Sequence, residues 1–450
     1  MEGAAGVSSD DSQRPILWSE GRVLTRAVLC ERVAALAREL PAAGYLVNLC
    51  EDRGHFIVAY CAAMLRGLTN LLPQSRAPEI VDEVVAAYAG SCRCGDLEVQ
   101  SAARPVASAP SWDAAVDAGY VAQISFTSGS TGTPRPHPKR WCNLLRSTQL
   151  NATRIRGCLA NRYGDAQPWI VATVPPQHMY GTEISVLLPL AAGMGVHAGR
   201  PLFPADVAAA LAAVPEPRVL VTTPVHLRAL VASKQRFPEI GAVVSATAPL
   251  HRELALAVEQ TLHTTLLEMF GSTETCVIAT RLTAQEECWE LYPGVTLEPD
   301  VDGARVHAPW FDDVTTLQDV IELRPGGRFL VRGRNADMID VAGKRASLAE
   351  LTRRLLSVPG VVDAVVFQTD GPGPALQGAP DGAVRRVAAL VVAPGLSGET
   401  IARRLAQSVD SAFLPRPLLT VDALPRNQVG KLTREDLNAA LRRAGESQAP

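Results

Sequence analysis

The stretch SFTSGSTGTPRPHPKRW, residues 125–141, places small and hydroxyl-bearing residues directly before prolines and cations. It continues from VAQISF, an apolar run that is typical of a buried strand. Closely spaced glycines let the backbone turn tightly and present several N–H groups to one point, and the hydroxyls add donors. The stretch lacks the Gly-x-x-x-x-Gly-Lys pattern of P-loop proteins. The sequence therefore predicts a phosphate-binding loop of another kind, with a flexible surface loop as the other interpretation.

Segments with strand and helix patterns alternate on both sides of this loop, up to about Cys288. Apolar runs such as PWIVATVP and PRVLVTTP end in a proline, and amphipathic segments such as HRELALAVEQTL lie between them. This alternation predicts an α/β fold with mostly parallel sheets, flanking helices, and ligand-binding loops at the carboxyl ends of the strands.

The pattern changes in the last third of the chain. After Cys288 the segments become short and strand-like, which predicts a β-rich tail of the large domain. From Arg334 the order helix, strand, strand, helix predicts a compact α+β unit. We therefore expect a large N-terminal domain over residues 1–333 and a small, mobile C-terminal domain over residues 334–450.

Composition excludes several classes of protein. A chain of 450 residues is longer than one hydrophobic core usually supports, and its formal net charge of -3 is too small to predict a nucleic-acid partner. The nine cysteines are scattered and never spaced as C-x-x-C, so we expect neither a disulfide framework nor a zinc site. The acidic amino terminus and the lack of a long apolar run predict a cytoplasmic protein without a membrane span.

Five motifs follow the order found in the adenylate-forming superfamily, which contains acyl- and aryl-CoA synthetases, luciferases and adenylation domains of peptide synthetases. The chain resembles this family over roughly two thirds of its length. The motifs are TSGSTGTP (127–134), FGSTE (270–274), TLQDVIEL (316–323), GRNADMIDVAGKRASLAEL (333–351) and LPRNQVGK (424–431).

The resemblance implies a reaction in two halves. A carboxylate attacks the α-phosphate of ATP and releases pyrophosphate, with Mg²⁺ screening the phosphates, and a thiol then displaces AMP. Lys431 would bridge the carboxylate and the α-phosphate. The β- and γ-phosphates would bind the first motif through Thr127, Ser128, Gly129, Ser130, Thr131 and Gly132.

The resemblance also assigns the remaining contacts to ATP and the metal. Phe270 would pack on the adenine, with an ordinary core phenylalanine as the other interpretation. The other residues are Gly271 beside it in the motif, Thr273 at the α-phosphate, Glu274 at magnesium, and Asp319 with Arg334 at the ribose.

Three positions depart from the family pattern. Arg135 stands where the family has a lysine after the phosphate loop, and Lys139 is an alternative cation for pyrophosphate. Ala336 occupies the usual hinge position of the fourth motif, and Asp340 replaces a lysine there. We therefore assign Ala336 no hinge role.

A further segment, VPPQHMYGTE (174–183), resembles the family motif in which a histidine or an aromatic residue gates the acid pocket. His178 would lie beside the substrate carboxylate, and Tyr180 and Gly181 would shape the pocket wall. A purely structural histidine is the other interpretation.

The chain length and the PRPHPK continuation resemble the AMP-ligases of aryl-polyene and xanthomonadin pigment biosynthesis. This resemblance implies a hydroxybenzoate-like aromatic acid and transfer to the phosphopantetheine thiol of an acyl carrier protein supplied in trans. Free coenzyme A is the alternative acceptor.

Two other classes of function are weighed. A degenerate nucleotide-binding regulatory protein is suggested by Arg135 and Ala336 and opposed by Glu274 and Lys431. A Rossmann-type oxidoreductase is suggested only by the α/β alternation, and no Gly-x-Gly-x-x-Gly follows a strand.

Overall fold

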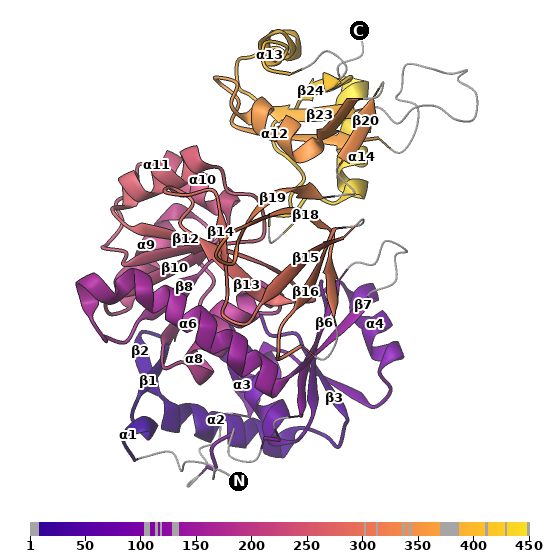
Figure 1. Cartoon of the computed structure of the whole chain (residues 1–450). Coiled ribbons are helices and arrows are strands. Elements are labelled where there is room, and N and C mark those ends of the chain that lie inside the picture. Colours follow the sequence, from indigo (N-terminus) through magenta and orange to yellow (C-terminus); the bar gives the residue numbers. More distant parts are fainter. Residues whose placement is uncertain are drawn as a thin grey trace. The chain divides into compact units, whose positions relative to one another are not determined.

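The chain forms two compact units (Figure 1). Unit 1 comprises Met1–Val295 and His307–Asp313, and unit 2 comprises Thr296–Val306 and Val314–Pro450. The computed structural model describes residues 9–102, 109–112, 116–117, 119–127, 135–300, 303–311, 314–334, 338–341, 344–369, 387–409, 413–427 and 430–447.

The division by internal contacts falls earlier than the domain boundary expected at residue 334. It does so because β15 (Thr296–Asp300) contacts β18 (Asp319–Arg324), so that the β-rich stretch groups with the C-terminal half. The expected division into a large N-terminal domain over residues 1–333 and a small C-terminal domain over residues 334–450 stays a prediction.

The larger sheet of unit 1 is mostly parallel, as the alternation of segments predicts. Its strands follow the order β14-β13-β12-β11-β10-β8-β9-β1-β2, and the neighbours from β12 to β1 all run parallel. The central strands consist of apolar residues at nearly every position because both faces of the sheet are covered. The strands are β1 (Pro15–Ser19), β2 (Arg22–Thr25), β8 (Trp169–Ala172), β9 (Gly195–His197), β10 (Arg218–Thr222), β11 (Ala242–Ser245), β12 (Thr265–Ser272), β13 (Cys276–Arg281) and β14 (Trp289–Leu291).

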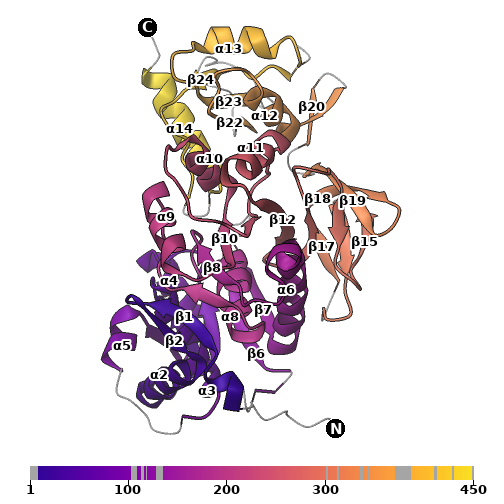
Figure 2. The same ribbon diagram turned by 90° about the vertical axis from the view of Figure 1, so that its left-hand side faces the viewer.

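Helices cover both faces of this sheet. Helices α9 (Pro204–Ala213), α10 (Pro224–Ala232) and α11 (Arg252–Leu262) share one hydrophobic core with β8, β10, β11 and β12. The long helix α6 (Trp141–Tyr163) packs against β11, β12 and β13 on the opposite face (Figures 1 and 2). The loops at the carboxyl ends of the strands therefore lie between two helical layers.

The second sheet of unit 1 has the order β5-β3-β4-β6-β7. Its edge strand β7 (Arg135–Arg140) runs antiparallel to β6 (Val121–Thr127). An edge strand tolerates the two prolines of RPHPKR because one side of its backbone needs no ladder partner. The other elements here are β3 (Tyr45–Asn48), β4 (Thr69–Leu72), β5 (Ser91–Cys94), α2 (Arg26–Glu39), α3 (Arg53–Leu65), α4 (Pro78–Ala87) and α5 (Asp96–Ser101).

A buried arginine joins the two sheets of unit 1. Arg53, the first residue of α3, is 0% exposed. Its guanidinium donates to the carbonyls of Val174 at 2.7 Å and Gly199 at 2.8 Å, just after β8 and β9. Burial lowers the pKa of Arg53 to about 10, so the group stays charged at neutral pH. The loop that leads to His178 is thus held by a cation on helix α3, which packs against β3 and β4 of the second sheet.

The described residues of unit 2 form short strands and three helices. Strand β18 pairs antiparallel with β19 (Arg328–Arg334), and β22 (Asp363–Gln368), β23 (Val387–Val392) and β24 (Leu418–Thr420) form a C-terminal sheet. Helices α12 (Leu348–Leu356) and α13 (Gly398–Leu405) share a core with this sheet, as expected for an α+β unit. The remaining strands are β15, β16 (Gly303–His307), β17 (Thr315–Leu317), β20 (Met338–Val341) and β21 (Lys344–Ser347), and the last helix is α14 (Arg434–Ser447).

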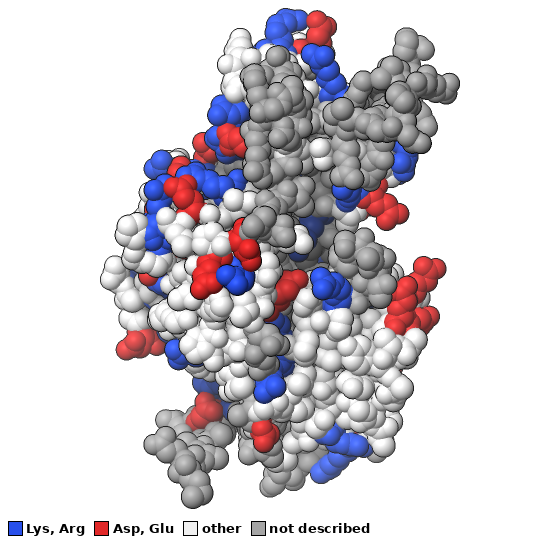
Figure 3. Space-filling model, turned by 45° about the vertical axis from the view of Figure 1, so that its right-hand side comes forward, with Lys and Arg blue, Asp and Glu red and all other residues white. Residues whose placement is uncertain are grey.

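The surface charge and the hydropathy of the helices are compared with what the composition predicts. On the face in Figure 3, cationic and anionic residues are interspersed among uncharged ones. Within the described part of the chain, no helix has the length and apolar character that crossing a membrane requires. All nine cysteines are free thiols.

Candidate functional site

Strands β6 and β7 hold the two ends of the predicted phosphate loop. Ser128, Gly129, Ser130, Thr131 and Gly132 lie outside the described residues. At the loop end of the hairpin, Thr127 pairs with Arg135. The Oγ1 of Thr127 lies 2.9 Å from Nε2 of His137, within hydrogen-bond distance. The start of the loop is therefore tied to the strand that follows it.

The FGSTE motif forms the turn between β12 and β13. Gly271 approaches the facing strand so closely that a Cβ would lie 2.1 Å from the carbonyl oxygen of Cys276, so no larger residue fits. Ser272 and Thr275 fix the turn through reciprocal hydrogen bonds between their main-chain N–H groups and hydroxyls, at 3.0 and 3.3 Å. Neither hydroxyl was singled out from the sequence.

Lys139 brings the β7 edge to this turn. Its side chain is buried, and Nζ donates a hydrogen bond to the main-chain carbonyl of Glu274. Arg135, four residues earlier on the same strand, is exposed. The two candidate cations for the missing loop lysine therefore differ: one is fixed on the Glu274 turn and the other faces solvent.

The carboxylate of Glu274 lies in a cationic environment. Burial alone would raise its pKa, but the hydrogen bond from Ser272 and the nearby charges of His137 and Lys139 bring the pKa below its ordinary value. The Nε2 of His137 lies 3.6 Å from Oε1 of Glu274. Burial lowers the pKa of His137, and its cationic neighbours Lys139 and Arg135 lower it further, against the raising effect of Glu274. Glu274 is thus an ionised, partly exposed carboxylate.

These residues fit a magnesium ion that is brought in by ATP. Mg²⁺ is usually held by one or two carboxylates together with substrate phosphates and water, rather than by a cage of protein side chains. Among the described residues, no group of three or more His, Cys, Asp and Glu side chains could hold a metal alone. Glu274 therefore suits a site that the phosphates complete.

Phe270 stands beside the same turn. Its ring is half-buried, and its centroid lies 5.2 Å from that of Trp289 at an angle of 48°. Arg281 covers the other ring at 4.3 Å from the centroid of Trp289. Phe270 is therefore part of a row of stacked side chains at one edge of the sheet, and its contact with adenine stays a prediction.

The predicted acid-pocket segment follows β8. His178 is half-buried and precedes helix α7 (Met179–Thr182). Tyr180 is buried, and its hydroxyl donates to the carbonyls of Thr222 at 3.2 Å and Val244 at 2.9 Å. At Gly181 a Cβ would lie 2.0 Å from the carbonyl oxygen of Pro175. Tyr180 and Gly181 thus lock the segment onto the carboxyl ends of β10 and β11.

A buried carboxylate at the end of this segment was missed by the sequence analysis. Glu183, in the π-helical turn η1 (Glu183–Leu187), is fully buried and accepts from Ser147 Oγ at 2.6 Å and Asn151 Nδ2 at 3.3 Å. It also accepts from the main-chain N–H of Val277 at 3.2 Å. Burial raises its pKa, while these hydrogen bonds and the charge of Lys139 oppose the rise. Glu183 thus connects α6 with β13 by hydrogen bonds and lies near the charge of Lys139. Its only signal in the sequence was an acidic residue at the end of VPPQHMYGTE.

The two residues predicted at the ribose meet in unit 2. Asp319 begins β18 and is the register partner of Arg334 at the end of β19. The backbone pairing brings together one residue from each of two successive motifs.

The predicted catalytic lysine lies on a short loop in unit 2. Lys431 is exposed, and its main-chain N–H donates to Oδ1 of Asn427 at 2.9 Å. Arg426 anchors the loop by donating to both carboxylate oxygens of Asp363 on β22, at 2.8 and 3.0 Å, and to the carbonyl of Gly430 at 2.9 Å. The sequence analysis quoted Arg426 within LPRNQVGK but gave it no role. Of the hinge positions, Ala336 lies outside the described residues and Asp340 belongs to β20.

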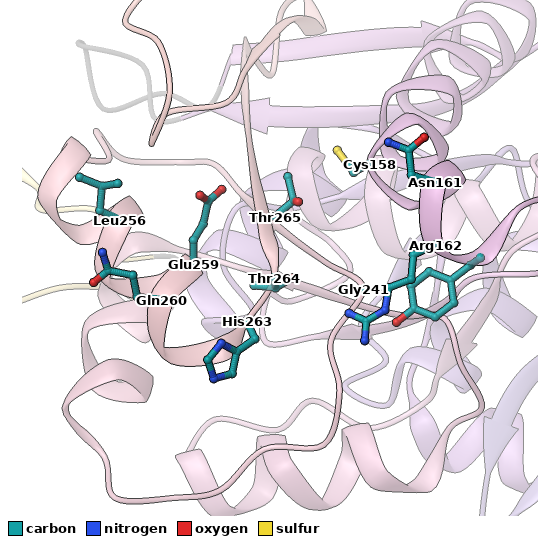
Figure 4. A pocket seen from close by; sticks show the side chains of 11 residues that line it. Cys158, Asn161, Arg162, Gly241, Leu256, Glu259, Gln260, His263, Thr264 and Thr265 are labelled. Atoms are coloured by element: carbon teal, nitrogen blue, oxygen red, sulfur yellow. The ribbon is translucent and has the colours of Figure 1, made fainter.

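A separate cavity is found elsewhere on unit 1. A hollow of about 540 Å³ lies at the amino ends of β11 and β12, between the last turns of α6 and α11. Figure 4 shows Cys158, Glu259 and His263 among its lining residues. None of the residues predicted from the sequence lines this cavity. It is therefore separate from the site at the carboxyl ends of the strands.

Comparisons with known proteins identify the family of the chain. A family model described as AMP-binding enzyme matches residues 39–309. A 4-coumarate–CoA ligase of Halorhodospira halophila is 29% identical over 316 residues, which cover 68% of this chain and 73% of that one. A 4-coumarate–CoA ligase of Rhodobacter capsulatus is 32% identical over 256 residues, which cover 56% and 61%.

Solved structures share the fold at low identity. ATP-bound MatB from Rhodopseudomonas palustris has a TM-score of 0.79 and 18% identity, with 96% of each chain covered. The anthranilate CoA ligase AuaEII in complex with anthranoyl-AMP has a TM-score of 0.76 and 14% identity, with 98% of this chain and 96% of that one covered.

The family match spans more than half of the chain, so the chain belongs to the AMP-binding enzyme family. The predicted adenylate-forming superfamily, its fold and its class of activity, an AMP-forming ligase, are confirmed.

Proposed function

We propose that this ligase adenylates an aromatic, hydroxybenzoate-like acid with ATP and Mg²⁺, and passes the acyl group to the phosphopantetheine thiol of an acyl carrier protein in trans. The observation that carries the proposal is the joint placement of Lys139, Glu274 and Thr127 at one edge of unit 1. A fixed cation, an ionised carboxylate and the start of a phosphate loop are the groups that a magnesium–triphosphate complex requires.

The aromatic acid is supported by the names of several relatives. The proteins similar to this chain include 4-coumarate–CoA ligases and a salicylyl-CoA synthase / salicylate adenylyltransferase of a Streptomyces species, which is 35% identical over 133 residues. That match covers 29% of this chain and 22% of the relative. The pigment-pathway resemblance of the PRPHPK segment points to the same class of acid.

In the first half-reaction, a carboxylate oxygen bonds to the α-phosphorus while the bond to the leaving pyrophosphate breaks. Lys431 would neutralise the two approaching anions, and Thr273 would donate to the α-phosphate. Lys139 would bind the pyrophosphate portion, because its Nζ is already fixed beside Glu274. Bound at Glu274, a magnesium ion would neutralise the developing charge on the phosphates.

In the second half-reaction, the thiol sulfur bonds to the acyl carbon and the bond to AMP breaks. AMP leaves with the oxygen that came from the carboxylate, and the thiol proton passes to solvent. His178 would lie beside the acyl group, on a segment that Tyr180 and Gly181 hold rigid.

ATP–pyrophosphate exchange tests the proposal directly. Purified protein with Mg²⁺ is assayed with benzoates, hydroxybenzoates, cinnamates and medium-chain fatty acids. We expect exchange with at least one hydroxybenzoate and much weaker exchange with fatty acids. If no acid supports exchange while ATP still binds, the result would contradict the proposal and favour a degenerate nucleotide-binding protein.

The acceptor is tested in a second assay. With the active acid, thioester formation is compared for holo-acyl carrier protein and free coenzyme A. A lower KM for the carrier supports transfer in trans. Equal or better use of coenzyme A would instead make the chain an aryl-CoA synthetase.

A further inference from the structure

Two arginines from separate parts of unit 1 border the segment that leads to His178. Arg76 follows β4, and its Nη2 donates to Oε1 of Gln177 at 3.1 Å. Arg200 follows β9, and its Nε donates to the carbonyl of Thr173 at 3.1 Å. Both guanidiniums therefore contact residues 173–177, on the side where the strands of the two sheets end.

The positive charge around this segment exceeds the negative charge that faces it. Oε1 of Glu51 lies 3.4 Å from Nη1 of Arg76, and this carboxylate side chain is 78% exposed. Burial lowers the pKa of Arg200, the charge of Arg76 lowers it further, and Glu51 opposes both effects. Arg53 is a third cation close enough to interact with Arg200, and Asp52 is the carboxylate that opposes it, so three arginines face two carboxylates. Bringing like charges together in a half-buried place costs free energy that a bound anion would offset.

Arg76 also has hydrogen-bonding capacity that the protein does not use. Its Nε is buried and has no hydrogen-bond partner among the residues that the structure describes. Buried polar groups nearly always have a partner, so the described protein groups do not fully satisfy the guanidinium of Arg76. His226 lies on the same side, 3.0 Å from Oγ1 of Thr173, and its pKa is lowered by burial and then by Arg200. It stays neutral near pH 7, which leaves the arginines as the cations of the site.

We propose that Arg76 and Arg200 bind the phosphate of the phosphopantetheine arm that carries the acceptor thiol. This inference rests on the proposed function. The reacting carboxylate and the triphosphate are assigned to Lys431 and Lys139, and a hydroxybenzoate-like acid has no second carboxylate. The phosphate of the acceptor is the one anion of the reaction that still needs a binding site.

The exposure of the two arginines fits this ligand. The side chain of Arg76 is 20% exposed and Arg200 is half-buried, so an anion reaches them from solvent. The arm carries its phosphate at one end and its thiol at the other. A phosphate held at the surface by guanidinium forks leaves the thiol end to pass along residues 173–177 toward His178. Coenzyme A and a carrier protein present the same phosphate, so the site serves either source.

Kinetics with three small acceptors test the assignment. Thioester formation is measured with pantetheine, 4′-phosphopantetheine and coenzyme A in the full chain and in Arg76→Met, Arg200→Met and Arg93→Met. Arg93 is a matched control because it is a half-exposed arginine on β5 of the same sheet as β4. Each lost arginine should raise the KM of the phosphorylated acceptors about tenfold or more and leave that of pantetheine unchanged. Arg76→Lys should recover part of the loss.

Two results would overturn the assignment. One is a wild-type protein that uses pantetheine as well as 4′-phosphopantetheine. The other is a variant in which the KM of the acid in ATP–pyrophosphate exchange rises while that of the acceptor does not, which would place the anion on the acid. Holo-carrier protein and coenzyme A, compared in the same variants, show which source the enzyme uses.

Failure of the proposed function is recognised separately, because it would appear as absent exchange with every acid. In that case the site is tested by calorimetric titration of 4′-phosphopantetheine into wild type, Arg93→Met and the Arg76→Met/Arg200→Met double variant. Binding that is lost only in the double variant supports the site. Equal binding in all three proteins, or none in wild type, rejects it.

Discussion

Lys139 shows how a single residue can have a placement that its motif does not predict. The family pattern points to position 135, yet Lys139, on the same face of β7, is buried against the Glu274 turn, whereas Arg135 at the start of the strand is exposed. A buried lysine needs a partner, and Lys139 has a carbonyl oxygen together with the nearby charges of Glu274 and Glu183. The sequence analysis left both cations open because burial on an edge strand depends on what packs against it.

The first prediction compares these two cations. Lys139→Ala should weaken ATP affinity about tenfold or more, because a charge-assisted contact to the phosphates is lost. Arg135→Ala should change the affinity less, since this side chain faces solvent. Equilibrium titration of ATP with each variant measures the effect. The reverse order of affinities would reject Lys139 as the replacement for the loop lysine.

The second prediction concerns Lys431. Lys431→Ala should lower the rate of ATP–pyrophosphate exchange by about a hundredfold or more, since a positioned cation at the reacting phosphate is removed. ATP affinity and the unfolding temperature should stay close to wild type because the side chain is exposed. Unchanged exchange in a folded variant would remove Lys431 from the catalytic residues.

At the scale of elements, alternating strands and helices were predictable and polar anchors were not. Apolar runs that end in proline mark β8 and β10 without ambiguity, because few other structures tolerate them. Arg53, Glu183 and Arg426 look like surface residues in the sequence. Their partners lie in distant segments, so only the packed structure shows that they fix the acid-pocket segment and the lysine loop.

The third prediction tests the anchor of the lysine loop. Arg426→Ala should lower exchange about tenfold, because Lys431 loses the loop geometry that the bidentate contact with Asp363 maintains. Asp363→Ala should have a similar effect, and the double variant should be no worse than either single variant. Additive losses in this double-mutant cycle would show that the two residues act independently.

The fourth prediction concerns the buried carboxylate of η1. Burial raises the pKa of Glu183, so the folded protein keeps this proton to a higher pH than the unfolded chain does. The stability of the wild type should therefore decline, relative to Glu183→Gln, as the pH rises from the ordinary glutamate pKa through the raised value. Unfolding temperatures of both proteins at matched pH values measure the difference. A difference that does not vary with pH would contradict the raised pKa.

At the scale of the whole molecule, unit 1 holds most of the residues predicted to bind ATP phosphates and the acid, whereas Asp319, Arg334 and Lys431 belong to unit 2. The sequence motifs assign residues to both parts. The division by contacts falls before the boundary expected at residue 334, because β15 contacts β18 and contacts between short strands leave little signal in local sequence.

The most direct test of the central claim follows oxygen through the complete reaction. The active aryl acid is labelled with ¹⁸O in both carboxylate oxygens, and the AMP formed with thiol acceptor is analysed by mass spectrometry. An acyl-adenylate requires one ¹⁸O atom in each AMP, because the attacking oxygen stays on the α-phosphorus when the thiol displaces it. AMP without ¹⁸O, or label in pyrophosphate, would contradict adenylation of the acid by this chain.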